Sequence, residues 1–300
     1  MMKSNSRLSL ALAAGRPVIT AECLPPFGGD AAAVKALSAV LPPGLDAVVV
    51  ADYAAGIQGS ALACAAILSG EGRQAVLSVA TRDRNRIALQ SEVLGAAALG
   101  VAAILCLSGD HQSLGTCPEA AAVYDIDSIQ FMNALKQMNE QGVGFNGHKL
   151  NPPPEFAIGA LAHPYQKPAE LGMLQLRKKI AAGADFFLTQ AVFDLPAFAQ
   201  WMEAVRDAGL DQRAVIIASV LPLESVEQAR QMQRRNTYGP VPESVIARLG
   251  SASNPAREGV AIAAEAAAQL KSLSGVRGIH ILSGGCEALA SAVIEQAGLA

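Results

Sequence analysis

The chain has 300 residues, of which 51% are hydrophobic and 16% charged, and its formal net charge is -3. This composition is sufficient for one large hydrophobic core, so we expect a single domain over residues 1–300. The weak net charge and the scarcity of Lys/Arg clusters argue against nucleic-acid binding, and no apolar run reaches the ~18 residues that a transmembrane helix needs. The five cysteines form no Cys-x-x-Cys pair, so neither a disulfide framework nor a metal site is predicted.

The first element is expected to be a short lead-in helix over residues 8–14, closed by Gly15. A secretory signal is disfavoured, because cleavage near Ala13 would leave almost no spacer before the first strand. A cytoplasmic protein is therefore expected.

Eight short and nearly continuous apolar runs then follow, at residues 18–21, 47–51, 75–80, 103–107, 156–161, 186–189, 214–218 and 278–282. Such runs are typical of strands that are buried on both faces of a parallel sheet. Helical periodicity occupies the intervals, for example at residues 31–41, 84–99, 170–182, 195–208, 225–234 and 257–273. This alternation predicts an α/β fold, the closed (β/α)₈ TIM barrel.

Active sites in these barrels lie at the carboxyl ends of the strands. The polar or otherwise distinctive residues that follow the eight runs are Glu22, Asp52, Arg82 with Asp83, Asp110, His163, Gln190 with Asp194, Pro222 and Ser283. Carboxylates and amides in this number indicate an enzyme site. Two irregular stretches, 111–123 and 142–155, are expected to be loops at the same end.

Glu22 leaves its strand into Cys-Leu-Pro-Pro, which fixes the backbone and directs the carboxylate into the barrel mouth. Apolar surroundings would raise the pKa of this carboxyl group, as a general acid requires. An equally open alternative is a rim carboxylate that pairs with an arginine.

Other residues carry weaker signals. Gly109 would let a ligand approach the backbone, and Asp110 would face a cationic or hydrogen-bond-donating ring or, alternatively, cap a helix. Gln190 offers a donor and an acceptor to a heterocycle edge, whereas Asp194 is expected mainly to cap the next helix.

Arginines surround Asp83 in the sequence Arg82-Asp83-Arg84-Asn85-Arg86, at the start of a helix. They are candidates for binding a phosphate, with a solvated charged loop as the alternative. Lys178 and Lys179 are explained equally well as favourable cations near a helix end.

Five blocks of sequence together resemble the methylenetetrahydrofolate reductase family, over roughly residues 6–298. They are Ile19 to Pro26, Thr81 to Arg86 leading into Leu89-Gln90-Ser91-Glu92, Leu107 to His111, Lys178 to Asp185, and Thr189 to Asp194. The Arg-Asp-Arg-Asn loop is similar to a divergent branch often found beside corrinoid-linked one-carbon enzymes.

The resemblance implies flavin-dependent reduction of 5,10-methylenetetrahydrofolate to 5-methyltetrahydrofolate, or the reverse oxidation, in one-carbon metabolism and methionine biosynthesis. Glu22 would be the general acid that protonates folate N10. Asp110 would hold the pterin and stabilise the iminium cation, and Gln190 and Gln228 would bind the pterin. For FAD, or FMN, the matched positions are Ser108, Gly109, Asp110, Tyr124, His163, Lys179 and Arg82.

Several positions depart from the family pattern. A threonine that contacts nicotinamide is replaced by Ala51, a stacking phenylalanine by Met232, and a folate-binding arginine by Cys286. A Pro-Gly pair is replaced by Ala218-Ser219, and a flavin-side histidine by Ser78. The folate chemistry is therefore better supported than NAD(P)H as the electron donor.

One alternative is a folate-binding partner subunit of a corrinoid-linked methyl-transfer system, without independent redox turnover. A barrel lyase or aldolase is disfavoured, because no strand-end lysine stands where a Schiff base would form. We expect a homo-oligomer, and an electron-donor or corrinoid methyltransferase protein as a partner.

Overall fold

The computed structural model describes residues 6–52, 58–235 and 238–299. Eight parallel strands pair in the order β1-β2-β3-β4-β5-β6-β7-β8 and close into a barrel, which confirms the predicted fold. The strands are β1 (Val18–Cys23), β2 (Ala47–Val50), β3 (Ala75–Ala80), β4 (Ala103–Leu107), β5 (Ala157–Ala162), β6 (Phe186–Ala191), β7 (Val215–Val220) and β8 (Val276–Ile281). Each strand end lies within about two residues of its predicted position.

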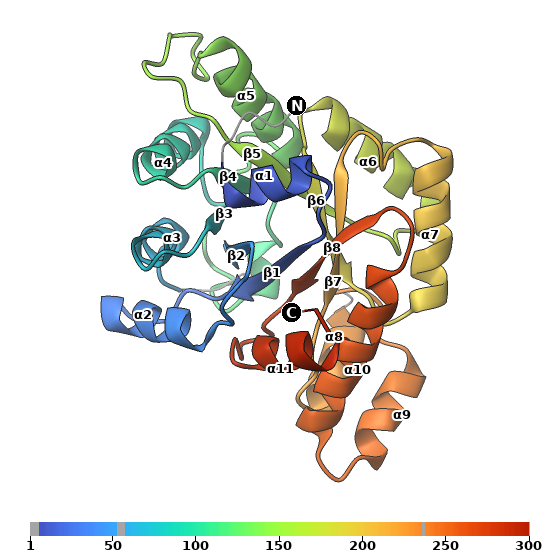
Figure 1. Cartoon of the computed structure of the whole chain (residues 1–300). Coiled ribbons are helices and arrows are strands. Elements are labelled where there is room, and N and C mark those ends of the chain that lie inside the picture. The colour runs from blue at the N-terminus through green and yellow to red at the C-terminus, as the bar shows by residue number, and fades with distance from the viewer. Residues whose placement is uncertain (1–5, 53–57, 236–237, 300) are drawn as a thin grey trace.

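The helices cover the outside of the barrel and its amino-terminal end (Figure 1). They are α1 (Arg7–Ala13), α2 (Ala31–Val40), α3 (Ala61–Gly70), α4 (Arg86–Ala98), α5 (Ser128–Gln141), α6 (Ala169–Ala181), α7 (Leu195–Asp207), α8 (Val226–Arg235), α9 (Glu243–Ser251), α10 (Pro255–Lys271) and α11 (Leu289–Gln296), with a 3₁₀ turn at Gln112–Leu114. No helix in these described ranges is long and apolar enough to cross a membrane.

Most strand residues are apolar because both faces of the sheet are covered. In β3, Leu77 and Val79 point outward and belong to the layer between strands and helices. Val76 and Ala80 point inward and belong to the barrel interior. This alternation determines which polar side chains reach the barrel axis.

Helix α1 is the predicted lead-in helix, and it closes the amino-terminal end of the barrel. The side chains of Leu8, Ala11 and Leu12 are buried in the same cluster as Val18 at the start of β1. The side chain of Ser6 accepts a hydrogen bond from the backbone of Ser9 and so begins the helix. Figure 1 shows α1 lying across this end of the barrel.

The expected position of residues 142–155 is wrong. They follow α5 and lead into β5, so they lie at the amino-terminal end of the barrel, opposite the candidate site. The prediction did not include α5, although Asp127 and Gln130 form a capping box at its start. Residues 111–123 do follow a strand, β4, as expected.

Candidate active site

Glu22 is the most deeply buried acidic residue at the carboxyl end of the barrel, with 2% of its surface exposed. It points inward because its neighbours Ala21 and Cys23 both belong to the outer layer. Its Oε2 accepts hydrogen bonds from the backbone N–H of Ser283, at 2.9 Å, and from the Ser283 hydroxyl, at 2.8 Å. Its Oε1 has no hydrogen-bond partner within the described part of the chain.

Burial raises the pKa of Glu22 to about 7. The hydrogen bonds from Ser283 oppose the shift and the nearby carboxylate of Glu287 adds to it, but removal of water from the charged form is the largest effect. The partner of Glu22 is thus a serine and not an arginine, so the rim ion pair considered above does not form. A carboxyl group with this pKa can hold and release a proton at neutral pH.

Two residues after β8 were not recognised as partners of the acid from the sequence. Ser283 was identified only as a strand-end residue, and Glu287 was not identified at all. The side chain of Glu287 is buried and its Oε1 accepts a hydrogen bond from the backbone N–H of Leu24 at 2.9 Å. The β8 loop therefore fixes both the Glu22 side chain and the turn that follows it.

The three arginines of the β3–α4 loop are each paired with a carboxylate. Arg82 donates to both oxygens of Asp83 and, from Nη1, to the backbone carbonyl of Asp110 at 2.9 Å. Arg84 donates to Asp52 at 2.7 Å, and Arg86 pairs with Asp125 at 2.8 Å. The charges expected to bind a phosphate are already neutralised by protein groups, and Arg82 is only 5% exposed. Geometry therefore gives no support to a phosphate-binding role for Arg82.

The β4 loop places Asp110 at the mouth with a free carboxylate. No hydrogen bond to its side chain occurs among the described residues, and burial raises its pKa while Arg82 lowers it. Gly109 has a φ of +82°, and a Cβ atom there would lie 3.1 Å from the Cβ of Arg82. The glycine thus makes room for Arg82, where the sequence predicted room for a ligand.

Tyr124 and Ser108, two further positions matched to a flavin, lie on the same β4–α5 connection. Tyr124 is the one non-glycine residue in the described ranges with a positive φ, +43°, a strained conformation that is often found at binding sites. Its ring is exposed and stacks on His111 with the centroids 6.5 Å apart. The Ser108 hydroxyl donates to the Ser128 hydroxyl at 3.0 Å.

His163, Gln190 and Lys179 meet where β5 and β6 end. Removal of water from the His163 ring, together with the charge of Lys179, lowers its pKa to about 4, and the side chain of Gln190 hydrogen-bonds to it. Lys179 donates to the carbonyl of Leu161 at 2.6 Å, and burial lowers its pKa to about 8. No carboxylate pairs with this ammonium group among the residues described, so a phosphate remains a suitable partner.

The other matched positions lie around the β7 and β8 loops. Oε1 of Gln228 accepts from the backbone N–H of Glu224 at 2.7 Å, and its Nε2 lies beside Gly284. Ala51 is fully buried, and Met232 packs against the cluster beneath α8 and α9. Asp194 caps α7 by accepting from the backbone N–H of Ala197 at 3.0 Å, as predicted.

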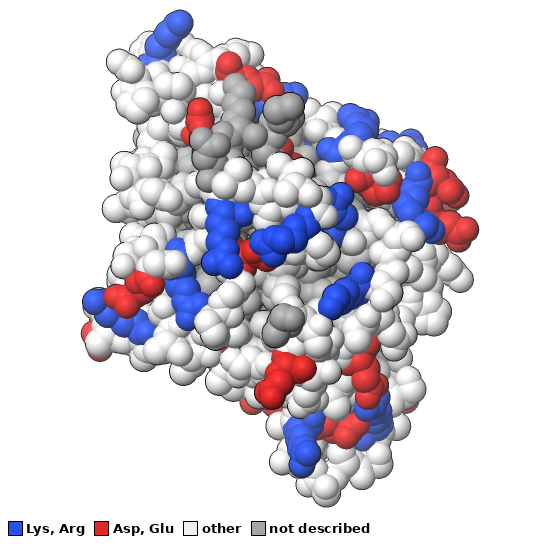
Figure 2. Space-filling model, in the orientation of Figure 1, with Lys and Arg blue, Asp and Glu red and all other residues white. Residues whose placement is uncertain are grey.

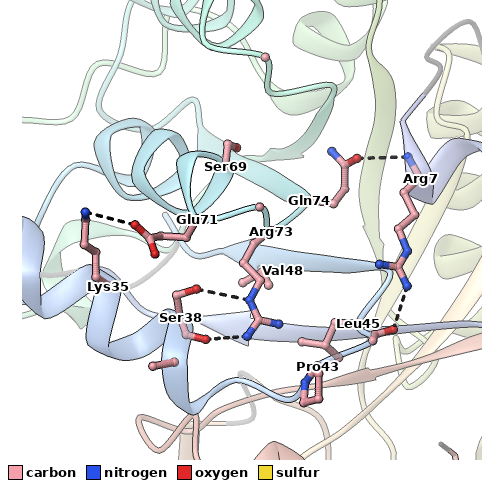
Figure 3. A pocket seen from close by; sticks show the side chains of 14 residues that line it. Arg7, Lys35, Ser38, Pro43, Leu45, Val48, Ser69, Glu71, Arg73 and Gln74 are labelled. Carbon is pink, nitrogen blue, oxygen red and sulfur yellow. Dashed lines mark hydrogen bonds and ion pairs between the residues drawn. The ribbon is translucent and has the colours of Figure 1, made fainter.

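A depression of about 670 Å³ lies at the opposite end of the barrel, between the ends of α2 and α3 (Figure 3). Arg73 projects into it but donates to the carbonyls of Ser38, Leu41 and Pro42. Basic side chains also gather over the α1 end of the molecule (Figure 2), where Arg7 and Arg16 pair with Asp46. These cations are already paired with protein groups, and the depression contains none of the predicted site residues.

Comparison with known proteins identifies the family of the chain. The sequence profile described as "Methylenetetrahydrofolate reductase" matches residues 7–298. Methylenetetrahydrofolate reductase 2 of Saccharomyces cerevisiae is 36% identical over 74 residues, which are 23% of this chain and 12% of the yeast protein. The 5,10-methylenetetrahydrofolate reductase of Escherichia coli is 33% identical over 69 residues, 23% of each chain. The matched segments thus span less than a quarter of these relatives.

Among solved structures, an uncharacterized protein from Clostridium thermocellum superposes with a TM-score of 0.68 at 14% identity, covering 98% of this chain and all of that one. That structure is described as binding two copies of 5-methyl-5,6,7,8-tetrahydrofolic acid. A 2,3-dimethylmalate lyase superposes with a TM-score of 0.52 at 15% identity and covers 97% of this chain and 85% of its own. These two likenesses establish the fold, whereas the profile match over almost the entire chain shows that it belongs to the methylenetetrahydrofolate reductase family.

Proposed function

We propose that this protein reduces 5,10-methylenetetrahydrofolate to 5-methyltetrahydrofolate, or catalyses the reverse oxidation, with a bound flavin. The observation that carries the proposal is Glu22: a buried carboxyl group with a pKa near 7 and one unpartnered oxygen, at the mouth of a barrel of this family. Opening the folate ring requires a proton at a nitrogen that is poorly basic, and such a group can supply it.

The other residues then have separable roles. The free carboxylate of Asp110 would stabilise the iminium cation that forms as the ring opens, because a negative charge at a partly buried mouth is poorly screened. The amides of Gln190 and Gln228 would bind the edge of the pterin, since each offers both a donor and an acceptor. Ser283 would hold the acid toward the folate.

The residues present fit a flavin in part. Asp110 has free acceptor atoms, the Tyr124 ring is exposed, and Lys179 keeps donor hydrogens beyond the one used at Leu161. Arg82 fits less well, because its charge is paired with Asp83 and its side chain is almost completely buried. When bound, a flavin supplies the hydride that converts the methylene carbon to a methyl group.

The test begins with purified protein that is incubated with FAD and separately with FMN, followed by removal of the free flavin. We expect about one flavin per chain. The flavin is then reduced with dithionite without oxygen and mixed with 5,10-methylenetetrahydrofolate, and the return of the oxidised flavin spectrum is followed. Folded protein that binds neither flavin, or a bound reduced flavin that folate does not reoxidise, would refute the proposal.

A second candidate is a folate-binding subunit that presents one-carbon units to a corrinoid protein. It is favoured by the β3–α4 loop, whose arginines are all paired with protein carboxylates, leaving few cations for a dinucleotide. Calorimetry separates the two candidates. Tight binding of 5-methyltetrahydrofolate by protein that takes up no flavin would favour the subunit.

A further inference from the structure

Five buried side-chain atoms lack a hydrogen-bond partner among the described residues, and three of them lie inside the barrel. The three are Oε1 of Glu22 and the hydroxyl oxygens of Ser78 and Ser219. Ser78 is 1% exposed and Ser219 is 0% exposed. Both serines point inward, because their strand neighbours Leu77, Val79, Ala218 and Val220 all belong to the outer layer.

The strand registers place these three side chains at one height. Glu22 pairs with Val49 of β2, and Val49 pairs with Val76 of β3. Because the strands of a barrel are tilted, the residue of β3 level with Glu22 is the next inward one, Ser78. On the other side of β1, Thr20 is in register with His280 of β8, and His280 is in register with Ser219 of β7. Glu22 is the next inward residue of β1 after Thr20.

The same tilt brings Ser219 level with Glu22, and Leu161 completes the layer from β5. Alternate strands thus contribute four side chains to the layer, as expected for this fold. They are Glu22, Ser78, Leu161 and Ser219, of which three are polar. Two are serines, which are much smaller than the branched residues that usually fill such a layer. The layer therefore combines unfilled hydrogen-bonding capacity with small side chains.

Thr20 and His280, which lie beneath this layer, supply no hydrogen bonds to its three unpartnered atoms. Oγ1 of Thr20 and Nδ1 of His280 lie 2.9 Å apart and bond to each other, and burial lowers the pKa of His280 to about 3, so it stays neutral. A buried hydroxyl without a partner is unfavourable by about 1–3 kcal/mol. A water molecule with two to four polar partners is the usual remedy.

We propose that Ser78 and Ser219 are positioning residues that hold ordered water in this layer, hydrogen-bonded to Oε1 of Glu22. Ser283 fixes one oxygen of the carboxyl group and the water layer fixes the other, so the acid cannot rotate away from the mouth. The inference rests on the proposed function only in treating Glu22 as the acid.

The direct test is infrared spectroscopy of the ligand-free protein at a pH well below 7. The band of the protonated Glu22 carboxyl is assigned as the one lost in Glu22→Gln. Ser78→Ala and Ser219→Ala should each move it to higher wavenumber, because the carbonyl loses hydrogen bonding, and the double variant should move it furthest. Ser9→Ala is the control, since it removes a buried hydroxyl from α1 at the other end of the barrel.

A kinetic readout complements the spectrum. In the double variant, oxidation of the reduced flavin by folate should slow by about fivefold, the equivalent of roughly one hydrogen bond. An unshifted band in both variants, or a high-resolution crystal structure in which both hydroxyls bond to strand carbonyls, would overturn the inference. Because the spectrum needs neither flavin nor folate, its result is independent of whether the proposed function fails.

Discussion

Glu22 holds a proton up to about neutral pH because burial raises its pKa more than its hydrogen bonds lower it. Burial removes the water that would stabilise the charged form, and the hydrogen bonds from Ser283 restore only part of that stabilisation. Glu287 adds a second negative charge nearby. Burial and these neighbouring groups together keep a proton on Glu22 up to about neutral pH.

Replacing Glu22 with Gln should preserve the fold and flavin binding, because the two side chains have nearly the same shape. Oxidation of the reduced flavin by folate should fall by about 10² to 10⁴, the usual contribution of a positioned general acid. Flavin reduction by the electron donor should hardly change. Stopped-flow measurement of both half-reactions checks this, and equal slowing of the two would show that Glu22 is structural.

The raised pKa of Glu22 also predicts how stability depends on pH. The folded protein holds this proton up to about pH 7, whereas the unfolded chain releases it near 4.5. Stability from this group is therefore complete below 4.5 and is lost as the pH rises through 7, by about 3 kcal/mol in total. Urea unfolding of wild type and Glu22→Gln from pH 4 to 8 should show the gap widening in favour of the variant.

The sequence was sufficient to select Glu22 as a candidate but not to predict its environment. A carboxylate at the end of a buried strand, followed by two prolines, was enough to select Glu22. Its partner Ser283 is separated from it by 261 residues and meets it only when β8 closes the barrel against β1. Contacts of this kind depend on register, which local patterns do not specify.

At the scale of elements, the β3–α4 loop is held by its own ion pairs. The side chains of Arg84 and Asp52 are largely buried, at 21% and 16% exposure, and Nη1 of Arg84 lies 2.7 Å from Oδ2 of Asp52. Removing the arginine leaves a carboxylate whose pKa is already raised by burial. The pairing explains why an arginine-rich sequence here does not present free positive charge.

Arg84→Met should therefore lower the free energy of unfolding by about 2 kcal/mol, because it leaves the Asp52 carboxylate without its charged partner. The matched control is Arg86→Met, which removes the exposed pair with Asp125 from the same loop and should have a much smaller effect. Denaturant titration of both variants gives the comparison. Equal losses would mean that burial of the pair is unimportant.

Gly109 gives a second prediction for the same region. Gly109→Ala must adopt a φ of +82° and place its Cβ 3.1 Å from Arg82. Gly147→Ala shares the conformational strain, at φ +77°, but meets nothing within 4 Å. Both should be destabilised by about 1 kcal/mol from backbone strain, and Gly109→Ala by more, because Arg82 must move. Thermal unfolding of the pair separates the two contributions, and equal shifts would exclude the contact.

Element prediction succeeded where periodicity was clear, but four helices, α3, α5, α9 and α11, were given no predicted range. The eight strands were predicted because burial on both faces makes them continuously apolar. Helix α5 was missed, although Phe131, Met132, Leu135 and Met138 form its buried face, because long polar stretches surround it. That omission placed residues 142–155 at the wrong end of the barrel.

For the whole molecule, the two ends of the barrel differ in the charged groups that they carry. The amino-terminal end is closed by α1, where Arg7 and Arg16 pair with Asp46, whereas the carboxyl groups of Glu22 and Asp110 belong to the other end. The candidate site residues are thus concentrated at the ends of the strands and on the loops that follow them. If the proposed function is correct, an electron donor reaches the same face.

The last prediction concerns that donor. The family pattern has a threonine where Ala51 is fully buried, and a phenylalanine where Met232 packs against the cluster beneath α8 and α9, so neither position offers the corresponding contact to a nicotinamide. Loss of a stacking ring and a hydrogen bond weakens binding by about 2 kcal/mol, or roughly thirtyfold. We expect free NADH to reduce the bound flavin poorly, with a partner protein or another donor serving instead. Anaerobic mixing with NADH and NADPH measures this directly. Complete bleaching within a second at micromolar NADH would show that the substitutions are tolerated and that no partner is needed.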